Sequence, residues 1–237
     1  MRTKTLLLSS LLGALSGLSM MAQSTNVYSL NAVGYINVTL PSGFSIIADQ
    51  LIATPNNEIG NVLPAPQDGT FDGTKLYKFS GAGGYKIYTL DSAQANSYDF
   101  NPGQNDPGTN VTLNPGEAAF FNNNSGATLS VTFVGTVPQG TNTVAIGTGF
   151  NLISSPVPQS GLVTTTLGFP VDFVNGNQDG DKLYLYNAGY TIYTVNSGLS
   201  SGWGVNANNE PSVNVGQGFF YLAQAPVSWT RVFSVNQ

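Results

Sequence analysis

The sequence predicts an all-β protein, built as two tandem small antiparallel β-barrels or sandwiches that are related by internal duplication. Three observations lead to this fold class. Five segments of the first half return in the second half in the same order. Short runs rich in Val, Ile, Tyr, Phe and Thr alternate with Gly, Pro, Asn and Asp, which is typical of strands and turns. Outside two short stretches, the 3.6-residue apolar period of helices is missing.

The repeated segments keep a nearly constant spacing. Gly43–Ala48 (GFSIIA) returns 106 residues later as Gly149–Ser154 (GFNLIS). The other four pairs, at spacings of 107, 105, 100 and 100 residues, are Asp72–Phe79 with Asp179–Tyr186, Gly84–Leu90 with Gly189–Val195, Asn114–Phe121 with Asn214–Tyr221, and Leu129–Val134 with Trp229–Ser234. Small insertions and deletions in loops explain the drift. We therefore expect one β-repeat module at 25–138 and a second at 139–237.

Each module is expected to contain six strands. In the first module the strand-like runs lie near 33–40, 43–51, 74–80, 84–90, 117–122 and 128–135. In the second they lie near 142–146, 149–155, 181–187, 189–195, 217–222 and 228–235. A helical turn is expected near Glu58–Leu63, with a counterpart near Leu162–Leu167.

One hairpin of each module has a register that can be worked out on paper. In the first module Phe79 pairs with Tyr85, which places Lys78 opposite Lys86. Because like charges directly opposite each other repel, we expect the lysine face outside and the aromatic face in the core. The side chains expected to be buried are Tyr77, Phe79, Tyr85 and Ile87, with Tyr184, Tyr186, Tyr190 and Ile192 as their counterparts.

Residues 1–24 have the layout of a secretory signal peptide. Arg2 and Lys4 precede a short apolar stretch, Leu6–Leu18, and Ala22 and Ser24 are small residues suited to a cleavage site. The alternative is a membrane anchor, but this stretch is short for a span of about 20 residues. We expect export to the periplasm, the cell surface or the medium, with no membrane span in the mature chain.

Composition excludes several classes of function. The chain has no His and no Cys, so Ser-His-Asp and Cys-His catalysis and ordinary zinc, haem and iron–sulfur sites are excluded. Charged residues make up only 8% of the chain, and its net charge is −5. Removal of the signal peptide leaves five basic and twelve acidic residues, a net charge of −7. Nucleic acid is therefore not an expected partner, since its binding needs clustered Lys and Arg.

Three segments carry a resemblance to a known group of proteins. They are NAVGYINVTLP at Asn31–Pro41, LNPGEAAF at Leu113–Phe120 and GFNLISSP at Gly149–Pro156. The mature chain resembles uncharacterised secreted two-repeat β-rich proteins of environmental Gram-negative bacteria. The resemblance implies export and a β-architecture, and it implies no activity, cofactor or catalytic residue.

A run of amides and carboxylates in the second module is similar to the first half of a calcium loop. Asn175, Asn177, Asp179 and Asp181 alternate around Gly180, and hard Ca²⁺ prefers several such oxygens. The Glu that a complete calcium loop carries at its twelfth position is replaced by Tyr186. Two interpretations stay open: a weak calcium site, or a tight Asp-Gly turn before a strand. No other cofactor is expected.

Aromatic residues in one pair of equivalent loops suggest a platform for sugar rings. Trp203 lies in a Gly/Ser/Asn-rich loop of the second module, and Tyr98 lies in the corresponding loop of the first. The amides of Asn206 and Asn208 lie beside Trp203 in sequence and have the groups to hydrogen-bond sugar hydroxyls. The alternative is that Trp203 folds back as an anchor for its own loop.

The sequence therefore predicts an exported, non-catalytic β-protein with a structural or adhesive role at the cell envelope or outside the cell. Extracellular polysaccharide, other envelope proteins and further copies of this chain are the expected partners. One alternative is a pair of carbohydrate-binding modules that use loop aromatics. A second is a carboxylate-dependent glycan hydrolase, for which the glutamates Glu58, Glu117 and Glu210 are available.

Overall fold

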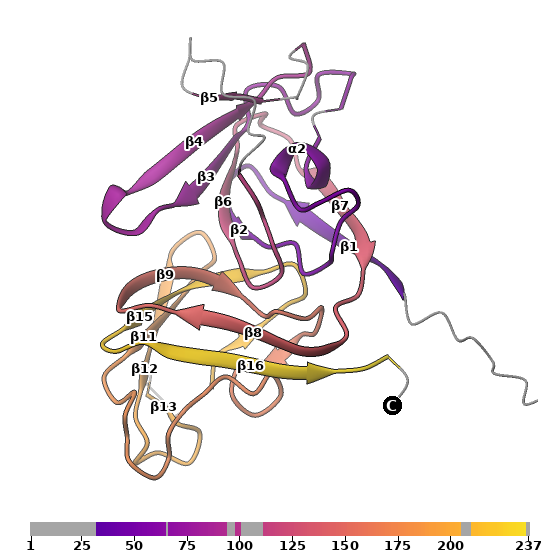
Figure 1. Cartoon of the computed structure of the whole chain (residues 1–237). Coiled ribbons are helices and arrows are strands. Elements are labelled where there is room, and N and C mark those ends of the chain that lie inside the picture. Colours follow the sequence, from indigo (N-terminus) through magenta and orange to yellow (C-terminus); the bar gives the residue numbers. More distant parts are fainter. Residues whose placement is uncertain (1–31, 65, 94–97, 101–110, 205–209, 236–237) are drawn as a thin grey trace, which may run out of the picture. The chain divides into compact units, whose positions relative to one another are not determined.

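The fold is nearly all β, as the sequence predicts, with antiparallel pairing throughout (Figure 1). The computed structural model describes residues 32–64, 66–93, 98–100, 111–204 and 210–235, and the predicted signal peptide lies outside them. None of the sheets formed by these residues closes into a barrel. Helical structure in the same residues is limited to α2 (Ile59–Val62) and a 3₁₀ turn, η1 (Gly81–Gly83).

The first half of the described chain forms a two-stranded and a five-stranded sheet. In the two-stranded sheet, β1 (Val33–Leu40) pairs with β7 (Leu129–Thr136). The five-stranded sheet has the order β2 (Gly43–Ile47), β6 (Ala119–Asn123), β3 (Lys75–Phe79), β4 (Tyr85–Leu90) and β5 (Tyr98–Phe100).

The second half repeats this arrangement with its own strands. A two-stranded sheet pairs β8 (Gly140–Ile146) with β16 (Val227–Phe233). The five-stranded sheet has the order β9 (Gly149–Ser154), β15 (Gly218–Ala223), β11 (Lys182–Tyr186), β12 (Tyr190–Val195) and β13 (Trp203–Gly204). A further short ladder joins β10 (Gly161–Leu162) to β14 (Ser212–Val213).

All twelve expected strands coincide with strands of the structure, and their ends differ by four residues at most. The helical turn expected near Glu58–Leu63 is α2. Its counterpart is a series of hydrogen-bonded turns, in which Thr166 N donates to Leu162 O at 3.0 Å and Gly168 N donates to Thr164 O at 2.9 Å. The short strands β5, β10, β13 and β14 were not predicted from the sequence.

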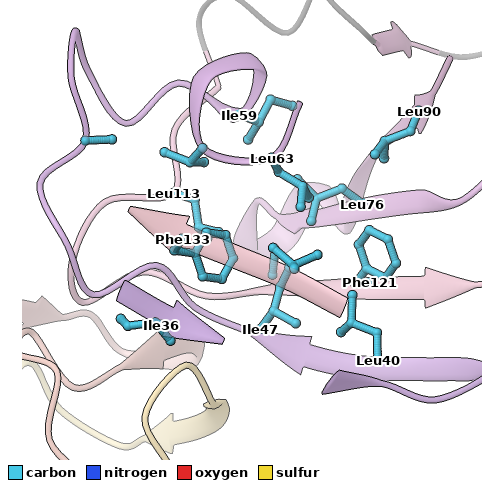
Figure 2. Close-up of a cluster of buried hydrophobic side chains, with 14 of the residues drawn as sticks. Ile36, Leu40, Ile47, Ile59, Leu63, Leu76, Leu90, Leu113, Phe121 and Phe133 are labelled. Carbon is cyan, nitrogen blue, oxygen red and sulfur yellow. The ribbon is translucent and has the colours of Figure 1, made fainter. Parts of the chain in front are cut away.

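Each half has its own apolar core, formed between its two sheets. In the first half, Leu40 and Phe133 of the two-stranded sheet pack with Ile47, Leu76 and Phe121 of the five-stranded sheet (Figure 2). In the second half, the corresponding cluster is centred on large rings that include Phe169, Trp203, Phe219, Tyr221 and Trp229. The described residues nevertheless belong to one compact unit, because a third buried cluster joins the halves. No helix in this part of the chain is long and apolar enough to cross a membrane.

Candidate functional site

The most distinctive surface feature lies where the two five-stranded sheets meet. Because side chains alternate along a strand, β3 directs Leu76 into the core of the first half and Tyr77 to the opposite face. The same alternation places rings from both sheets together. We call this set of ten residues the aromatic junction: Phe44, Tyr77, Phe79, Tyr85, Phe120, Phe150, Tyr184, Tyr186, Tyr190 and Phe220.

The rings of the aromatic junction make matching contacts in the two halves. Phe44 packs on Tyr77 with ring centroids 5.5 Å apart, and their counterparts Phe150 and Tyr184 are 5.6 Å apart. Between the halves, the Phe79–Phe220 pair and the Phe120–Tyr186 pair are both at 5.4 Å, with interplanar angles of 90° and 85°. Edge-to-face pairs of this kind are favourable beyond the area that they bury.

Two backbone hydrogen bonds hold the halves together beside these rings. Ala48 N donates to Gly216 O at 2.9 Å, and Ser154 N donates to Gly116 O at 3.0 Å. Each bond joins a residue at the end of an edge strand, or directly after it, to a turn of the other half. The exchange is reciprocal, as in the interface of a symmetric dimer.

The aromatic junction is only partly shielded from solvent. Phe44, Tyr85, Phe150 and Tyr190 expose 43%, 41%, 48% and 50% of their surface. Desolvation, followed by the nearby Tyr190, raises the pKa of the Tyr85 hydroxyl, and desolvation also raises the pKa of Tyr190. Both phenols are therefore neutral at physiological pH. Four large rings at the surface of one small protein form an apolar area of the kind that marks a contact site.

This exposure corrects one prediction from the sequence. The predicted hairpin registers are confirmed, since Phe79 pairs with Tyr85 and Lys78 with Lys86. The predicted burial is wrong for Tyr85 and Tyr190, which are exposed. Ile192 is exposed, whereas Tyr77, Phe79, Ile87, Tyr184 and Tyr186 are only half-buried. The lysine face, which was expected outside, is the one that the core takes. Besides Lys78 and Lys86 it carries Leu76, Tyr88 and Leu90, which are buried.

A hollow of about 290 Å³ opens among the rings. Six residues of the aromatic junction line it: Phe79, Tyr85, Phe150, Tyr184, Tyr190 and Phe220. Its lining includes residues of both halves, so neither half forms it alone. The chemistry of these walls is restricted to ring surfaces and phenol hydroxyls.

A larger and more polar groove, of about 860 Å³, lies on another side of the junction. Phe44 and Tyr186 contribute rings to it, and Asn37, Asn187 and Asn214 contribute amides. The side-chain amides of Asn187 and Asn214 make no hydrogen bond to any residue that the structure describes. Rings beside free amides are a combination that suits a sugar.

Trp203 does not present a ring face in this structure. Its side chain is fully buried, and its Nε1 donates to Thr164 Oγ1 at 2.7 Å. Its ring packs on Phe169 at 6.0 Å in the core of the second half. These contacts favour the alternative role, in which Trp203 anchors its loop. The short strand β5 contains Tyr98, whose side chain lies outside the described residues, as do Asn206 and Asn208.

The residues considered for calcium form hydrogen bonds with different groups of the protein. Asn175 and Asn177 both donate from Nδ2 to Asp172, at 3.1 and 2.6 Å. Asp179 accepts from Ser197 N and Oγ, at 2.6 and 2.8 Å. Asp181 is buried and accepts from Tyr221 and Gln224. The geometry favours the tight-turn interpretation, and the described residues hold no cluster of three or more acidic metal ligands.

Asp72 of the first half makes the same contacts as Asp179 of the second. It accepts from Ser92 N and Oγ, each at 2.8 Å, just as Asp179 accepts from Ser197. The two aspartates are 107 positions apart and the two serines are 105 positions apart, and both pairs make the same hydrogen bonds. In the neighbouring turn, hydrogen bonds from Asn175 lower the pKa of the exposed Asp172 carboxyl.

Two of the glutamates considered for glycan hydrolysis are engaged in structural contacts. Glu117 forms an ion pair with Lys78 at 3.1 Å and accepts from Asn114 N at 2.9 Å. Glu210 accepts from Thr164 N and from Thr165 N and Oγ1. Glu58 directly precedes α2 and forms an isolated β-bridge with Thr112. Comparison of the chain with protein-family models, with curated proteins and with solved structures finds no match.

Proposed function

We propose that this chain is an exported, non-catalytic protein, built from two copies of one β-module, that has a structural or adhesive role at the cell envelope or outside the cell. The observation that carries the proposal is the aromatic junction. It is a contiguous, partly exposed set of rings to which both halves contribute matching residues.

The matched architecture supports duplication. The five-stranded sheets place equivalent strands in the same order, and equivalent ring pairs differ in centroid distance by 0.1 to 0.3 Å, as in Phe44–Tyr77 against Phe150–Tyr184 and Phe79–Tyr85 against Tyr186–Tyr190. Two unrelated modules would have no reason to share these contacts. Duplication then supplies a surface of doubled area, which favours adhesion.

A binding assay on envelope material tests this role. Purified mature protein is mixed with washed cell envelopes and with insoluble polysaccharides, and the bound fraction is measured by sedimentation. We expect the double substitution Tyr190→Ser and Phe150→Ser to reduce binding at least five-fold, because it removes exposed ring surface. Tyr35→Ser is the matched control, since Tyr35 is 69% exposed on β1 and outside the aromatic junction.

Equal binding by the double variant and the wild type would contradict the proposal, provided that both unfold at the same temperature. Absence of binding to every surface in the panel would contradict it as well. A loss of binding in the Tyr35→Ser control would show that any exposed ring contributes and that the aromatic junction has no special role.

Carbohydrate binding is the second candidate, and the amide-lined groove favours it. Phe44 and Tyr186 supply ring surface there, while Asn187 and Asn214 supply amides without protein partners among the described residues. A glycan array probed with the wild type and with Asn187→Ala, Asn214→Ala tests this candidate. We expect a bound glycan to be lost from the variant and kept by Asn142→Ala, whose amide caps a distant strand end by donating to Gly140 O.

A further inference from the structure

The hollow of the aromatic junction is enclosed by an almost continuous sequence of ring contacts. Tyr85 packs on Phe79 at 5.4 Å, and Phe79 packs on Phe220 at 5.4 Å. Phe220 continues to Phe150 at 6.1 Å, Phe150 to Tyr184 at 5.6 Å, and Tyr184 to Tyr190 at 6.1 Å. Tyr85 and Tyr190, at the two ends of this sequence of contacts, both line the same hollow. Six rings thus surround about 290 Å³.

These walls can form very few hydrogen bonds. No residue of the lining carries a carboxylate, an amide, an ammonium or a guanidinium group. The polar atoms available are the hydroxyls of Tyr85, Tyr184 and Tyr190, none of which bonds to another described residue. A ligand group that needs several hydrogen bonds would lose them to water on entry, at a cost of about 1–3 kcal/mol each. The hollow therefore selects a group that needs none.

Electrostatics favours a cation over a neutral hydrocarbon group. The face of each aromatic ring carries negative potential, and a cation within about 6 Å of a ring centroid is attracted to it. The chain as a whole has a net charge of −5. The nearest cation in sequence, Lys86, follows Tyr85 but pairs with Lys78 on the opposite face of the hairpin, so it does not fill the hollow.

We propose that this hollow is a binding site for a quaternary ammonium group, such as the trimethylammonium head of choline. Such a group is charged but has no N–H to satisfy, which matches walls with ring faces and almost no hydrogen-bonding groups. Its methyl groups contact the rings while its charge interacts with several ring faces at once. The volume lies at the lower end of the range for ligand pockets, which fits a small head group. The hollow is part of the aromatic junction, so this inference rests on the proposed function and names a ligand class for the same surface.

Titration calorimetry of the mature protein with choline, and with its neutral isostere 3,3-dimethylbutan-1-ol, tests the proposal. The two molecules have the same shape and differ in the charge, so the comparison isolates the cation–ring attraction. We expect choline to bind at least ten-fold more tightly than the neutral alcohol. Equal affinity, or tighter binding of the alcohol, would overturn the proposal in favour of a purely apolar pocket. Absence of choline binding would overturn it outright.

Three variants locate the binding to the hollow. Tyr190→Leu removes a ring face and is expected to weaken choline binding at least five-fold, whereas Tyr190→Phe keeps the ring and is expected to retain it within two-fold. Tyr35→Leu is the control outside the hollow. Equal loss in Tyr190→Leu and Tyr190→Phe would show that the hydroxyl carries the interaction, which contradicts the proposal. Tyr190 is half exposed, so these variants are expected to fold.

A quaternary ammonium group can be free in solution or borne by a lipid. Sedimentation with phosphatidylcholine vesicles, compared with phosphatidylglycerol vesicles, distinguishes the two sources. Selective binding to phosphatidylcholine together with choline binding assigns a lipid head group, and choline binding without vesicle binding assigns a soluble ligand. If the wild-type protein binds envelopes but does not bind choline, this inference is rejected and the proposed function remains.

Discussion

The side chain of Asp181 is a buried carboxyl group that accepts hydrogen bonds in the second half and has no equivalent in the first. Tyr221 OH donates to Asp181 Oδ2 and Gln224 N donates to Oδ1, both at 2.8 Å. Burial, followed by the hydrogen bond to Asp181, raises the pKa of Tyr221. In the first half Thr74 and Phe121 occupy the equivalent positions, so neither the carboxylate nor its donor is present.

This pairing predicts a coupled effect on stability. Tyr221→Phe leaves a buried carboxylate oxygen without its donor and is expected to lower the free energy of unfolding by about 1–3 kcal/mol. Adding Asp181→Thr recreates the first-half pair, because Thr74 Oγ1 donates to Phe71 O at 2.7 Å. Urea unfolding should show the double variant to be more stable than the sum of the single variants. Strict additivity would contradict the pairing.

Asp49 predicts a dependence of stability on pH. Burial raises the pKa of its carboxyl to about 7, although hydrogen bonds from Leu51 N and Asn57 Nδ2 act in the opposite direction. Between about pH 4 and pH 7 the folded state therefore keeps a proton that the unfolded state has released. The free energy of unfolding should fall as pH rises through this window, by up to about 4 kcal/mol, and stay level above it.

Asp49→Asn removes the titrating group and should abolish most of that slope. The measurement is urea unfolding of both proteins at pH 4, 5.5 and 7.5. Parallel curves for the two proteins across these pH values would show that another group is responsible.

Among the secondary-structure elements, β15 meets the turn before β6 with almost no space between them. A methyl group placed on Gly218 would lie 2.3 Å from Cβ of Ala118 and 2.8 Å from Cγ2 of Ile46. Ala118 and Gly218 are 100 residues apart and occupy equivalent positions, so equivalent residues meet at the centre of the junction. There is room for one methyl group there and not for two.

Gly218→Ala is therefore expected to destabilise the fold by about 1–3 kcal/mol through overpacking. Adding Ala118→Gly removes the opposing methyl group and should restore part of the loss, measured as melting temperature. The control is Ala118→Gly alone, which should be mildly destabilising. A double variant that melts no higher than Gly218→Ala would place the strain elsewhere, with Ile46 as the remaining neighbour.

The strands and the hairpin registers were predictable from local patterns, but the allocation of their faces was not. Pairing of Lys78 with Lys86 follows from the length of the turn between the two strands. Which apolar face turns to the core and which to the other half depends on partners distant in sequence. A similar limit applies to Trp229, which the repeat aligns with Leu129. In the structure Trp229 pairs with Val144, as Val131 pairs with Val38 in the first half. Trp229 therefore corresponds to Val131, because the loop before it is two residues shorter than in the first half.

The candidate site was less predictable than the fold for the same reason. A Trp in a Gly-rich loop is typical of an exposed platform, but Trp203 has a hydrogen-bond partner in Thr164 and a place in the core. The ten rings of the aromatic junction come from eight strands, and only the alternation of Tyr77 with Leu76 signalled a second apolar face. Their convergence depends on how the two sheets pack.

At the scale of the whole molecule, the halves are joined by one covalent link and by the junction. A protease site inserted between Pro138 and Gln139 tests how much the junction contributes. After cleavage we expect the two fragments to elute together on gel filtration and to separate only in denaturant, because aromatic packing and the bonds at Ala48 and Ser154 persist. Separate peaks of half the mass after cleavage would show that the link alone holds the halves together.

The hollow gives its occupant a second effect. Phe79 and Tyr85 come from one half and the remaining four wall residues from the other, so any parting of the halves dismantles the cavity. A ligand bound in the hollow would therefore link the two halves, and the free energy of unfolding would rise with the concentration of that ligand. Heat resistance of the full-length chain would then rise with nothing more than a small solute in the medium.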